Sequence, residues 1–271
     1  MRQFIASQAP DKKGLIKVSG KDYRYLRQVL RLRSGDMLSV RLPDGELQNT
    51  TVCEINEEGR IITLQICADT NNGSITRGVQ TEDIQSESQG ACVEYWLFQY
   101  IAKPVKMEQI IRQAVECGVK YIVPVAGEYS QKQNVQAMQS GKKDRIERII
   151  REARQQSGSP VDTMVLNPVR TEEAVELWNK AVLEDSEGKN NSSAVVLWER
   201  NENTRSLFEC FASEKKRVAV AVGCEGGISP EEIQILMNSG FAPVHFAGNI
   251  LRCETAAIYG LAAVQCVVNK F

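Results

Sequence analysis

The sequence predicts an α/β protein in which a mostly parallel sheet domain follows a small all-β domain. From residue 91 to residue 271, short apolar runs alternate with amphipathic helical segments, which is typical of a parallel sheet covered on both faces. Residues 1–70 instead hold short runs separated by turn residues, as in a small β-barrel. Residues 71–90 are polar and almost free of large apolar side chains, so we expect a linker there.

The first domain is expected to contain one helix, at residues 22–32. Arg24, Arg27 and Arg31 are spaced three and four apart, so they would share one face of that helix. Such a face either keeps a helix solvated or contacts RNA, and the spacing leaves both interpretations open. Asp44-Gly45 is a hairpin signal between strands. The predicted strands are residues 37–42, 48–55 and 60–67.

The second domain is expected to alternate strands with helices. Its apolar runs predict strands at residues 92–100, 121–125, 163–166, 194–198, 218–222 and 243–246. Helical periodicity predicts helices at residues 105–117, 145–156, 172–181 and 205–212, one beginning after residue 229, and one at 254–268.

Two loops in this domain have the composition of ligand-binding loops. Gly223-Cys224-Glu225-Gly226-Gly227 follows a buried strand, and Ser229 with Glu232 forms a capping box for the next helix. The second loop runs from Gly248 into the apolar last helix. Because the carboxyl ends of parallel strands meet at one edge, these loops predict a ligand cleft. Ordinary strand-to-helix turns would give the same spacing.

Composition excludes several classes of protein. The eight cysteines include no C-x-x-C pair and His245 is the only histidine, so we expect no metal site. His245 falls in a strand-like run and is interpreted as a core residue. The sequence has no P-loop and no G-x-G-x-x-G motif. It also shows no signal peptide or membrane span, so we expect a cytoplasmic protein with reduced cysteines and no membrane contact.

Charge is distributed unevenly along the chain. The net charge is −1, but residues 1–43 hold ten Lys or Arg against three Asp. An excess of seven positive charges in one segment favours contact between the first domain and nucleic acid.

Several segments match the motifs of one enzyme family over nearly the whole chain. They are Met1-Arg2-x-Phe4, residues 30–36, Lys103 with Glu108, residues 114–119, residues 152–157, Gly223-Cys224-Glu225-Gly226-Gly227, and residues 248–256. The chain thereby resembles the 16S rRNA (uracil-N3)-methyltransferase family of the SPOUT superfamily. It departs from the family pattern at Gln155, Ser159 and Cys224, where the family carries Glu, Arg and Pro.

The resemblance implies a fold, a cofactor and partners. Residues 1–70 would form a PUA-like RNA-binding barrel, and residues 91–271 a SPOUT methyltransferase domain with a trefoil knot. The cofactor would be S-adenosyl-L-methionine, and the partners would be 16S ribosomal RNA or the small ribosomal subunit and a second copy of the chain in a homodimer. The apolar last helix is consistent with a subunit contact.

The resemblance also assigns site residues. The cofactor would be bound by Leu197, Gly223, Glu225, Gly226, Gly227, Gly248, Ile250, Leu251, Arg252, Glu254, Thr255 and Ala256. From the resemblance together with the basic charge of the first segment, we expect the RNA-binding residues to be Arg2, Arg24, Arg27, Arg31, Arg33 and Lys103.

Methylation at uridine N3 requires a base and a group that stabilises the base anion. N3 carries a proton at neutral pH, so a carboxylate to accept it and an arginine beside the ring are the simplest pair. Arg252, Glu254 and Glu225 are therefore the candidate catalytic residues. Glu254 could instead act as a helix N-terminal charge paired with Arg252, and the sequence does not distinguish which carboxylate takes the proton. Cys224 and Cys253 are interpreted as packing residues.

Two other functions remain open at this point. Another SPOUT enzyme, such as a ribose 2′-O-methyltransferase, would have a related fold, and a non-catalytic RNA-binding protein would have lost the cofactor site. Nucleoside analysis of the product distinguishes the first, and a cofactor titration distinguishes the second.

Overall fold

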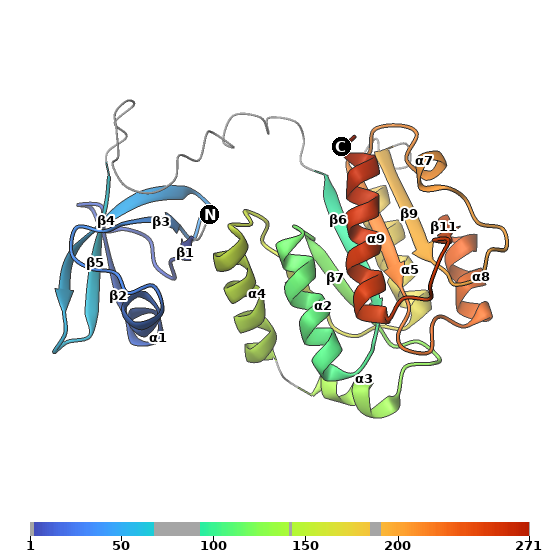
Figure 1. Cartoon of the computed structure of the whole chain (residues 1–271), viewed down its shortest axis with the longest axis horizontal. Helices are drawn as coiled ribbons and strands as arrows, with labels where there is room; N and C mark the ends of the chain where they lie inside the picture. The colour runs from blue at the N-terminus through green and yellow to red at the C-terminus, as the bar shows by residue number, and fades with distance from the viewer. Residues whose placement is uncertain (1–2, 68–92, 141–142, 185–190, 271) are drawn as a thin grey trace. The chain divides into compact units, whose positions relative to one another are not determined.

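The computed structural model describes residues 3–67, 93–140, 143–184 and 191–270 (Figure 1). They form two compact units. The first holds the described residues of Met1–Asp83 and Arg154–Pro160, and the second holds those of Ile84–Ala153 and Val161–Phe271. The predicted linker at residues 71–90 and the predicted RNA-binding residue Arg2 lie outside the described residues.

The first unit contains a five-stranded sheet in the order β1-β3-β4-β5-β2. β1 pairs with β3 in parallel, and the other neighbours are antiparallel. The sequence predicted β3, β4 and β5. It missed β1, which is too short to show a periodicity, and β2, which alternates over only a few residues. The strands are β1 (Phe4–Ile5), β2 (Leu15–Ser19), β3 (Met37–Arg41), β4 (Leu47–Asn56) and β5 (Ile61–Ile66).

The helix of this unit is shorter than predicted and ends before Arg31. It consists of α1 (Gly20–Arg24) and a π-helical continuation, η1 (Tyr25–Val29). Arg31 has a φ of 56°, and the Leu32 N–H donates to the Leu26 carbonyl at 3.0 Å. This left-handed closure ends a helix at a position where sequence normally signals it with glycine. The prediction that Arg31 lies on the helix face is therefore wrong.

The second unit contains a six-stranded sheet in which all paired strands are parallel. Its order is β11-β9-β10-β6-β7-β8. β11 begins and ends two residues before the prediction and includes Pro243, which an edge strand tolerates because one side of it needs no ladder bonds. The strands are β6 (Glu94–Tyr100), β7 (Tyr121–Val125), β8 (Met164–Val165), β9 (Ser192–Leu197), β10 (Arg217–Val222) and β11 (Phe241–Val244).

The helices between these strands largely follow the prediction. The polar helix α3 was not predicted, because it has few apolar residues from which to read a period, and α7 is shorter than expected. The helices are α2 (Pro104–Glu116), α3 (Lys132–Gln139), α4 (Lys143–Ser157), α5 (Thr171–Leu183), α7 (Leu207–Cys210), α8 (Pro230–Asn238) and α9 (Cys253–Val268).

Helices cover both faces of the parallel sheet. Along β6, Trp96 and Phe98 point into a core shared with α5 and α8, while Tyr95 and Leu97 point into a core shared with α2, α4 and α9. This alternation is expected for a strand buried on both sides. α2 and α9 lie side by side on one face (Figure 1).

Candidate active site

Three loops meet at the carboxyl ends of β9, β10 and β11 and line a pocket of about 480 Å³. The loops follow Leu197, Val222 and Val244, and the pocket is closed on another side by Lys106 of α2. Because the three strands are neighbours in a parallel sheet, their ends must open at the same edge. Its lining comprises Lys106, residues 197–199, residues 222–228, residues 244–246, residues 248–253 and Ala256.

The glycine-rich loop after β10 is a tight turn with backbone in close contact. The Gly227 N–H donates to the Cys224 carbonyl at 3.0 Å, and Gly227 has a φ of 82°. A Cβ on Gly223 would lie 2.7 Å from the Gly227 carbonyl carbon, closer than any side chain permits. The sequence therefore needs glycine at both positions.

The predicted capping box fixes where this loop ends. The Ser229 hydroxyl accepts from the Glu232 N–H at 3.3 Å, and the Glu232 carboxylate accepts from the Ser229 N–H at 3.3 Å. Glu232 also accepts a hydrogen bond of 2.7 Å from the Thr171 hydroxyl of α5. α8 therefore begins at a defined residue, which positions the loop against the sheet.

Lys106 connects the two candidate catalytic carboxylates. Its Nζ lies 2.8 Å from Oε2 of Glu254 and 3.7 Å from Oε1 of Glu225. The same nitrogen lies 3.7 Å from the Cys253 sulfur, whose thiol donates to Glu254 Oε2 at 3.3 Å. Three segments far apart in the sequence thus meet at one cation.

These contacts shift the pKa values of the cluster. The hydrogen bond from Lys106 lowers the pKa of Glu254 to about 2, and the same contact raises the pKa of Lys106. Burial raises the pKa of Cys253 to about 12, and burial also raises the pKa of Cys224. Both thiols therefore stay protonated at neutral pH, in agreement with their interpretation as packing residues.

The pocket brings together most of the predicted cofactor residues. Those in its lining are Leu197, Gly223, Glu225, Gly226, Gly227, Gly248, Ile250, Leu251, Arg252 and Ala256. Glu254 stands behind the lining and reaches it through Lys106. Thr255 is exposed on the first turn of α9 and is not among the described lining residues.

The sequence missed eleven residues of the pocket lining, and four of these are charged or aromatic groups that bear on ligand binding: Lys106, Trp198, Glu199 and His245. The other seven are Val222, Cys224, Ile228, Val244, Phe246, Asn249 and Cys253. His245 is half-buried in the lining with its Nδ1 3.2 Å from the Trp198 carbonyl oxygen, so its interpretation as a core residue is wrong. That strand ends at Val244, which leaves His245 at the start of the loop. Lys106 follows Lys103 by three residues, but only the strand order places α2 beside α9.

The predicted RNA-binding residues have different environments. In the first unit, Arg24, Arg31 and Arg33 are exposed, whereas Arg27 pairs with Glu57 at 2.6 Å and donates to the Leu32 carbonyl at 2.7 Å. Arg24 and Arg27 line a cleft with Tyr23, Gln28, Glu57 and Arg60. In the second unit, Lys103 is exposed before α2, and its backbone N–H donates to Glu225 Oε1 at 3.2 Å.

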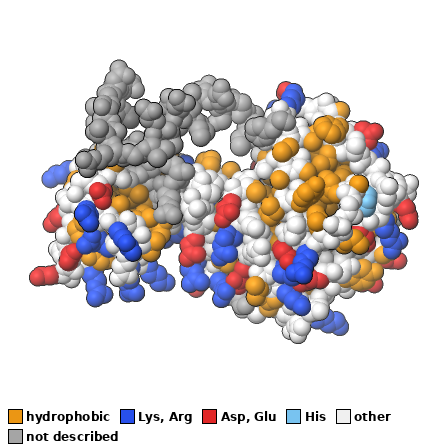
Figure 2. Space-filling model, viewed as in Figure 1, with side chains coloured by type: hydrophobic (Ala, Val, Ile, Leu, Met, Phe, Trp, Pro, Cys, Tyr) orange, Lys and Arg blue, Asp and Glu red, His pale blue; other side chains and the backbone are white. Residues whose placement is uncertain are grey.

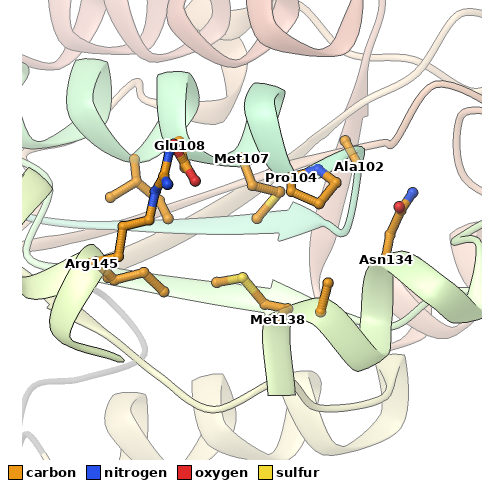
Figure 3. Close-up of a pocket in the computed structure, with 10 residues that line it drawn as sticks. Ala102, Pro104, Met107, Glu108, Asn134, Met138 and Arg145 are labelled. Carbon is orange, nitrogen blue, oxygen red and sulfur yellow. Dashed lines mark hydrogen bonds and ion pairs between the residues drawn. The ribbon is translucent and has the colours of Figure 1, made fainter. Parts of the chain in front are cut away.

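A second cavity of this unit lies among α2, α3 and α4 and is mainly apolar (Figure 3). Met107 and Met138 line it, and Asn134 stands at one end (Figure 3). Glu108 and Arg145, the charged residues of its described lining, pair with each other at 2.6 Å. This cavity therefore offers no free charged group for catalysis.

Within the described ranges, no helix is long and apolar enough to cross a membrane. Over the same ranges, no three His, Cys, Asp or Glu side chains gather in a group that could bind a metal ion.

Comparison with known proteins points to one family. Residues 89–265 match the RNA methyltransferase domain. The ribosomal RNA small subunit methyltransferase E of Buchnera aphidicola subsp. Schizaphis graminum is 28% identical over 251 residues, 93% of this chain and 90% of the relative. That of Aquifex aeolicus is 27% identical over 238 residues, 83% of this chain and 93% of the relative.

A solved structure shares the fold over nearly the full length. A ribosomal RNA small subunit methyltransferase E from Neisseria gonorrhoeae, bound to S-adenosyl methionine, superposes with a TM-score of 0.72 at 21% identity, covering 98% of each chain. Since the family match spans more than half of the sequence and includes every loop of the pocket, the chain belongs to the RNA methyltransferase domain family.

Proposed function

We propose that this protein transfers a methyl group from S-adenosylmethionine to N3 of a uridine in the 16S ribosomal RNA of the small ribosomal subunit. The observation that carries the proposal is the pocket at the ends of β9, β10 and β11, which is lined by a glycine loop, Glu225 and Arg252, with Lys106 joining Glu225 to Glu254 behind the lining. Its relatives across 90% or more of their length are named as small-subunit ribosomal RNA methyltransferases.

The pocket has the size and chemistry that S-adenosylmethionine requires. A volume of about 480 Å³ lies within the range of ordinary small-molecule sites. Leu197 and Leu251 offer apolar contact for an adenine ring, and the glycine loop offers backbone groups without side chains in the way. The carboxylates of Glu199 and Glu225 complement the positive charge of a sulfonium.

The side chains around the pocket supply the remaining chemistry. S-Adenosylmethionine, when bound, provides an electrophilic methyl group. A carboxylate at the pocket then accepts the N3 proton of uridine, and Arg252 stabilises the negative charge that develops on the base oxygens. The thiols of Cys224 and Cys253 are not needed, because N3 itself is the nucleophile once it has lost its proton.

We infer a division of labour between the two parts of the chain. Residues 1–70 would act as a PUA-like RNA-binding domain, and residues 91–271 as a SPOUT domain with its chain knotted around the cofactor loops. The basic residues of the first unit and its cleft beside Arg24 support the first assignment. The parallel order β11-β9-β10-β6, in which strand neighbours differ from sequence neighbours, supports the second.

We also infer a homodimer formed through α9. Tyr259, Ala262 and Cys266 are exposed on one side of this helix, and hydrophobic side chains gather on that surface (Figure 2). Tyr259 packs edge-to-face on Phe246, with ring centroids 5.0 Å apart, and Phe246 lines the pocket. A second subunit bound to this surface would therefore contact Tyr259, which packs against the loop that lines the pocket.

A cytoplasmic location fits this function. The seven cysteines of the described residues are all free thiols, which suits a reducing compartment.

Cells that lack the protein provide the test in vivo. Mass spectrometry of their 16S ribosomal RNA should show one uridine that has lost its N3 methyl group, and the restored gene should return it. Ribosomal RNA with an unchanged set of methylated uridines would contradict the proposal.

A further inference from the structure

The two carboxylates beside Lys106 have different surroundings, although both belong to the same cluster. Glu254 has 15% of its side chain exposed and Glu225 has 34%. Glu254 Oε2 receives both the short Lys106 contact of 2.8 Å and the Cys253 thiol at 3.3 Å. Glu254 is therefore engaged by its neighbours within the protein.

Glu225 keeps one oxygen free for a substrate. Its Oε1 accepts from the Lys103 backbone N–H at 3.2 Å and faces Lys106 at 3.7 Å. Within the described residues, Oε2 of Glu225 has no hydrogen-bond partner. Glu225 also lines the pocket, whereas Glu254 lies behind Lys106. The contacts at Oε1 fix the carboxylate while Oε2 stays accessible.

A general base works best when its proton affinity matches the operating pH. A carboxylate in a short ion pair with an ammonium binds a proton weakly, which is the situation of Glu254 with its pKa of about 2. The group that lines the pocket and keeps a free oxygen is better placed to take a proton from a bound base.

We propose that Glu225 is the catalytic base, that Lys106 is a positioning residue which orients it, and that Glu254 anchors Lys106. This inference rests on the proposed function and assigns the roles within that site. The N3 proton moves to Oε2 of Glu225, and the N3 electron pair forms the new N–CH₃ bond. The electrons of the broken S–CH₃ bond stay on sulfur, so the positive sulfonium becomes a neutral thioether as the carboxylate becomes a neutral acid.

Other charged and titratable groups face the cluster and are part of its pH response. Arg252 and Glu199 line the same pocket from two of the loops, and His245 lines it from the third. Cys253 contacts both Lys106 and Glu254 directly from α9. A pH profile of one variant therefore has to be compared with the profiles of the others.

The test compares single-turnover methylation of small-subunit RNA by Glu225→Gln, Glu254→Gln, Lys106→Met and Lys106→Arg across pH. Glu225→Gln should slow methyl transfer on the order of a hundredfold or more and remove the acid limb of the rate profile, while the protein still binds S-adenosylmethionine. Glu254→Gln and Lys106→Met should each slow it roughly tenfold and keep the acid limb.

The double variant and the conservative variant test the positioning role. Because Lys106 and Glu254 act through one ion pair, the Lys106→Met/Glu254→Gln protein should be no slower than the slower single variant. Lys106→Arg keeps the charge and should recover most of the rate. Multiplicative losses in the double variant would overturn the positioning role, and loss of the acid limb in Glu254→Gln but not in Glu225→Gln would overturn the choice of base.

A titration of the cofactor-free protein gives a readout that does not depend on activity. Carboxyl ¹³C NMR should find Glu254 titrating near 2 in the unmodified protein, and Lys106→Met should raise that value toward 4.5. An unchanged titration in Lys106→Met would overturn the anchoring of Lys106 by Glu254. If the unmodified protein produces no methylated uridine, both the proposed function and the role of Glu225 are overturned. The titration would still test the Lys106–Glu254 ion pair, because it does not depend on activity.

Discussion

The contacts of one side chain, Lys106, set the charge and pKa pattern beside the pocket. Its ammonium group touches Glu254, Glu225 and Cys253. Two glycines allow backbone conformations that other residues rarely adopt. Gly227 has a φ of 82°, and Gly240, just after α8, has a φ of 89°. The first lies in the pocket lining, whereas the second is exposed with open space around it.

This pair of glycines gives a matched test of the cofactor loop. Gly227→Ala and Gly240→Ala should each destabilise the protein by roughly 1–2 kcal/mol, because both force an L residue into the left-handed region. Only Gly227→Ala should weaken binding of S-adenosylmethionine, since Gly227 lies in the pocket lining and its new Cβ, in ordinary contact with the Glu199 carboxylate at 3.6 Å, would take up space there. Thermal unfolding and calorimetric titration measure the two effects, and equal affinity in both variants would remove the loop from the cofactor site.

The low pKa of Glu254 predicts an acid-sensitive contribution to stability. Lys106 lowers it to about 2 from an ordinary value of 4.5, so the unfolded chain takes up this proton first as the pH falls. The ion pair therefore contributes fully above about pH 4.5 and loses its contribution progressively toward pH 2. Urea unfolding should show the stability gap between the unmodified protein and Glu254→Gln narrowing over that window, with Lys106→Met behaving similarly. A gap that stays constant over the window would contradict this origin of the shift.

The pocket residues that directly follow a strand could be predicted from the sequence. Those that other helices bring to the pocket could not. The residues from Gly223 to Gly227 could be predicted because glycines and a charge come directly after a buried strand. Lys106 could not, because its contact with Glu254 depends on β10 lying beside β6, which brings α9 next to α2. Nothing local in the sequence encodes that neighbourhood.

Buried strands were easier to predict from the sequence than the point at which a helix ends. Buried strands such as β7 and β10 were predicted within one residue, since short apolar runs mark them. The helix that carries Arg24 and Arg27 ended early, because a non-glycine residue, Arg31, adopts the left-handed closure. Its arginines consequently have different environments, since Arg24 is exposed whereas Arg27 pairs with Glu57.

The cleft of the first unit predicts which of these arginines bind RNA. Arg24 and Arg60 are exposed in the cleft, so the Arg24→Ala/Arg60→Ala protein should bind RNA more weakly, with the slope of log K against log salt reduced by about 0.7–0.9 per lost phosphate contact. Arg27→Ala should mainly lower stability, because Arg27 is engaged by Glu57 and the Leu32 carbonyl. Filter binding over a salt series, urea unfolding and a cofactor titration separate these effects. An unchanged slope in the double variant would place the RNA contact on another surface.

For the whole molecule, the question is how one chain serves both a cofactor and a large RNA. The parallel sheet places its ligand loops at one edge, and α9 leaves an apolar strip exposed beside them. The sequence predicted the α/β class from alternating elements, and the match to the RNA methyltransferase domain confirms the family to which the motifs pointed. Periodicity could not give the order of the strands, because helices of similar pattern can connect a parallel sheet in several orders.

The exposed strip of α9 predicts a dimer on which the cofactor site depends. Ala262→Arg should shift the protein toward a monomer in light scattering and lower its affinity for S-adenosylmethionine, because a bulky charge would sit in the subunit contact. Ala9→Arg, an exposed alanine of the first unit, is the matched control and should change neither property. A monomeric unmodified protein with full activity would exclude the dimer.

If this pocket directs a methyl group to uridine N3, the product of the reaction is 3-methyluridine, which mass spectrometry identifies. The purified protein should be incubated with small ribosomal subunits and methyl-labelled S-adenosylmethionine, and the RNA digested to nucleosides for mass spectrometry. We expect the label in 3-methyluridine, with the Arg252→Ala protein on the order of a hundredfold slower because the base anion loses its stabilising charge. Label in a 2′-O-methylated nucleoside, or in no nucleoside at all, would contradict methyl transfer to uridine N3.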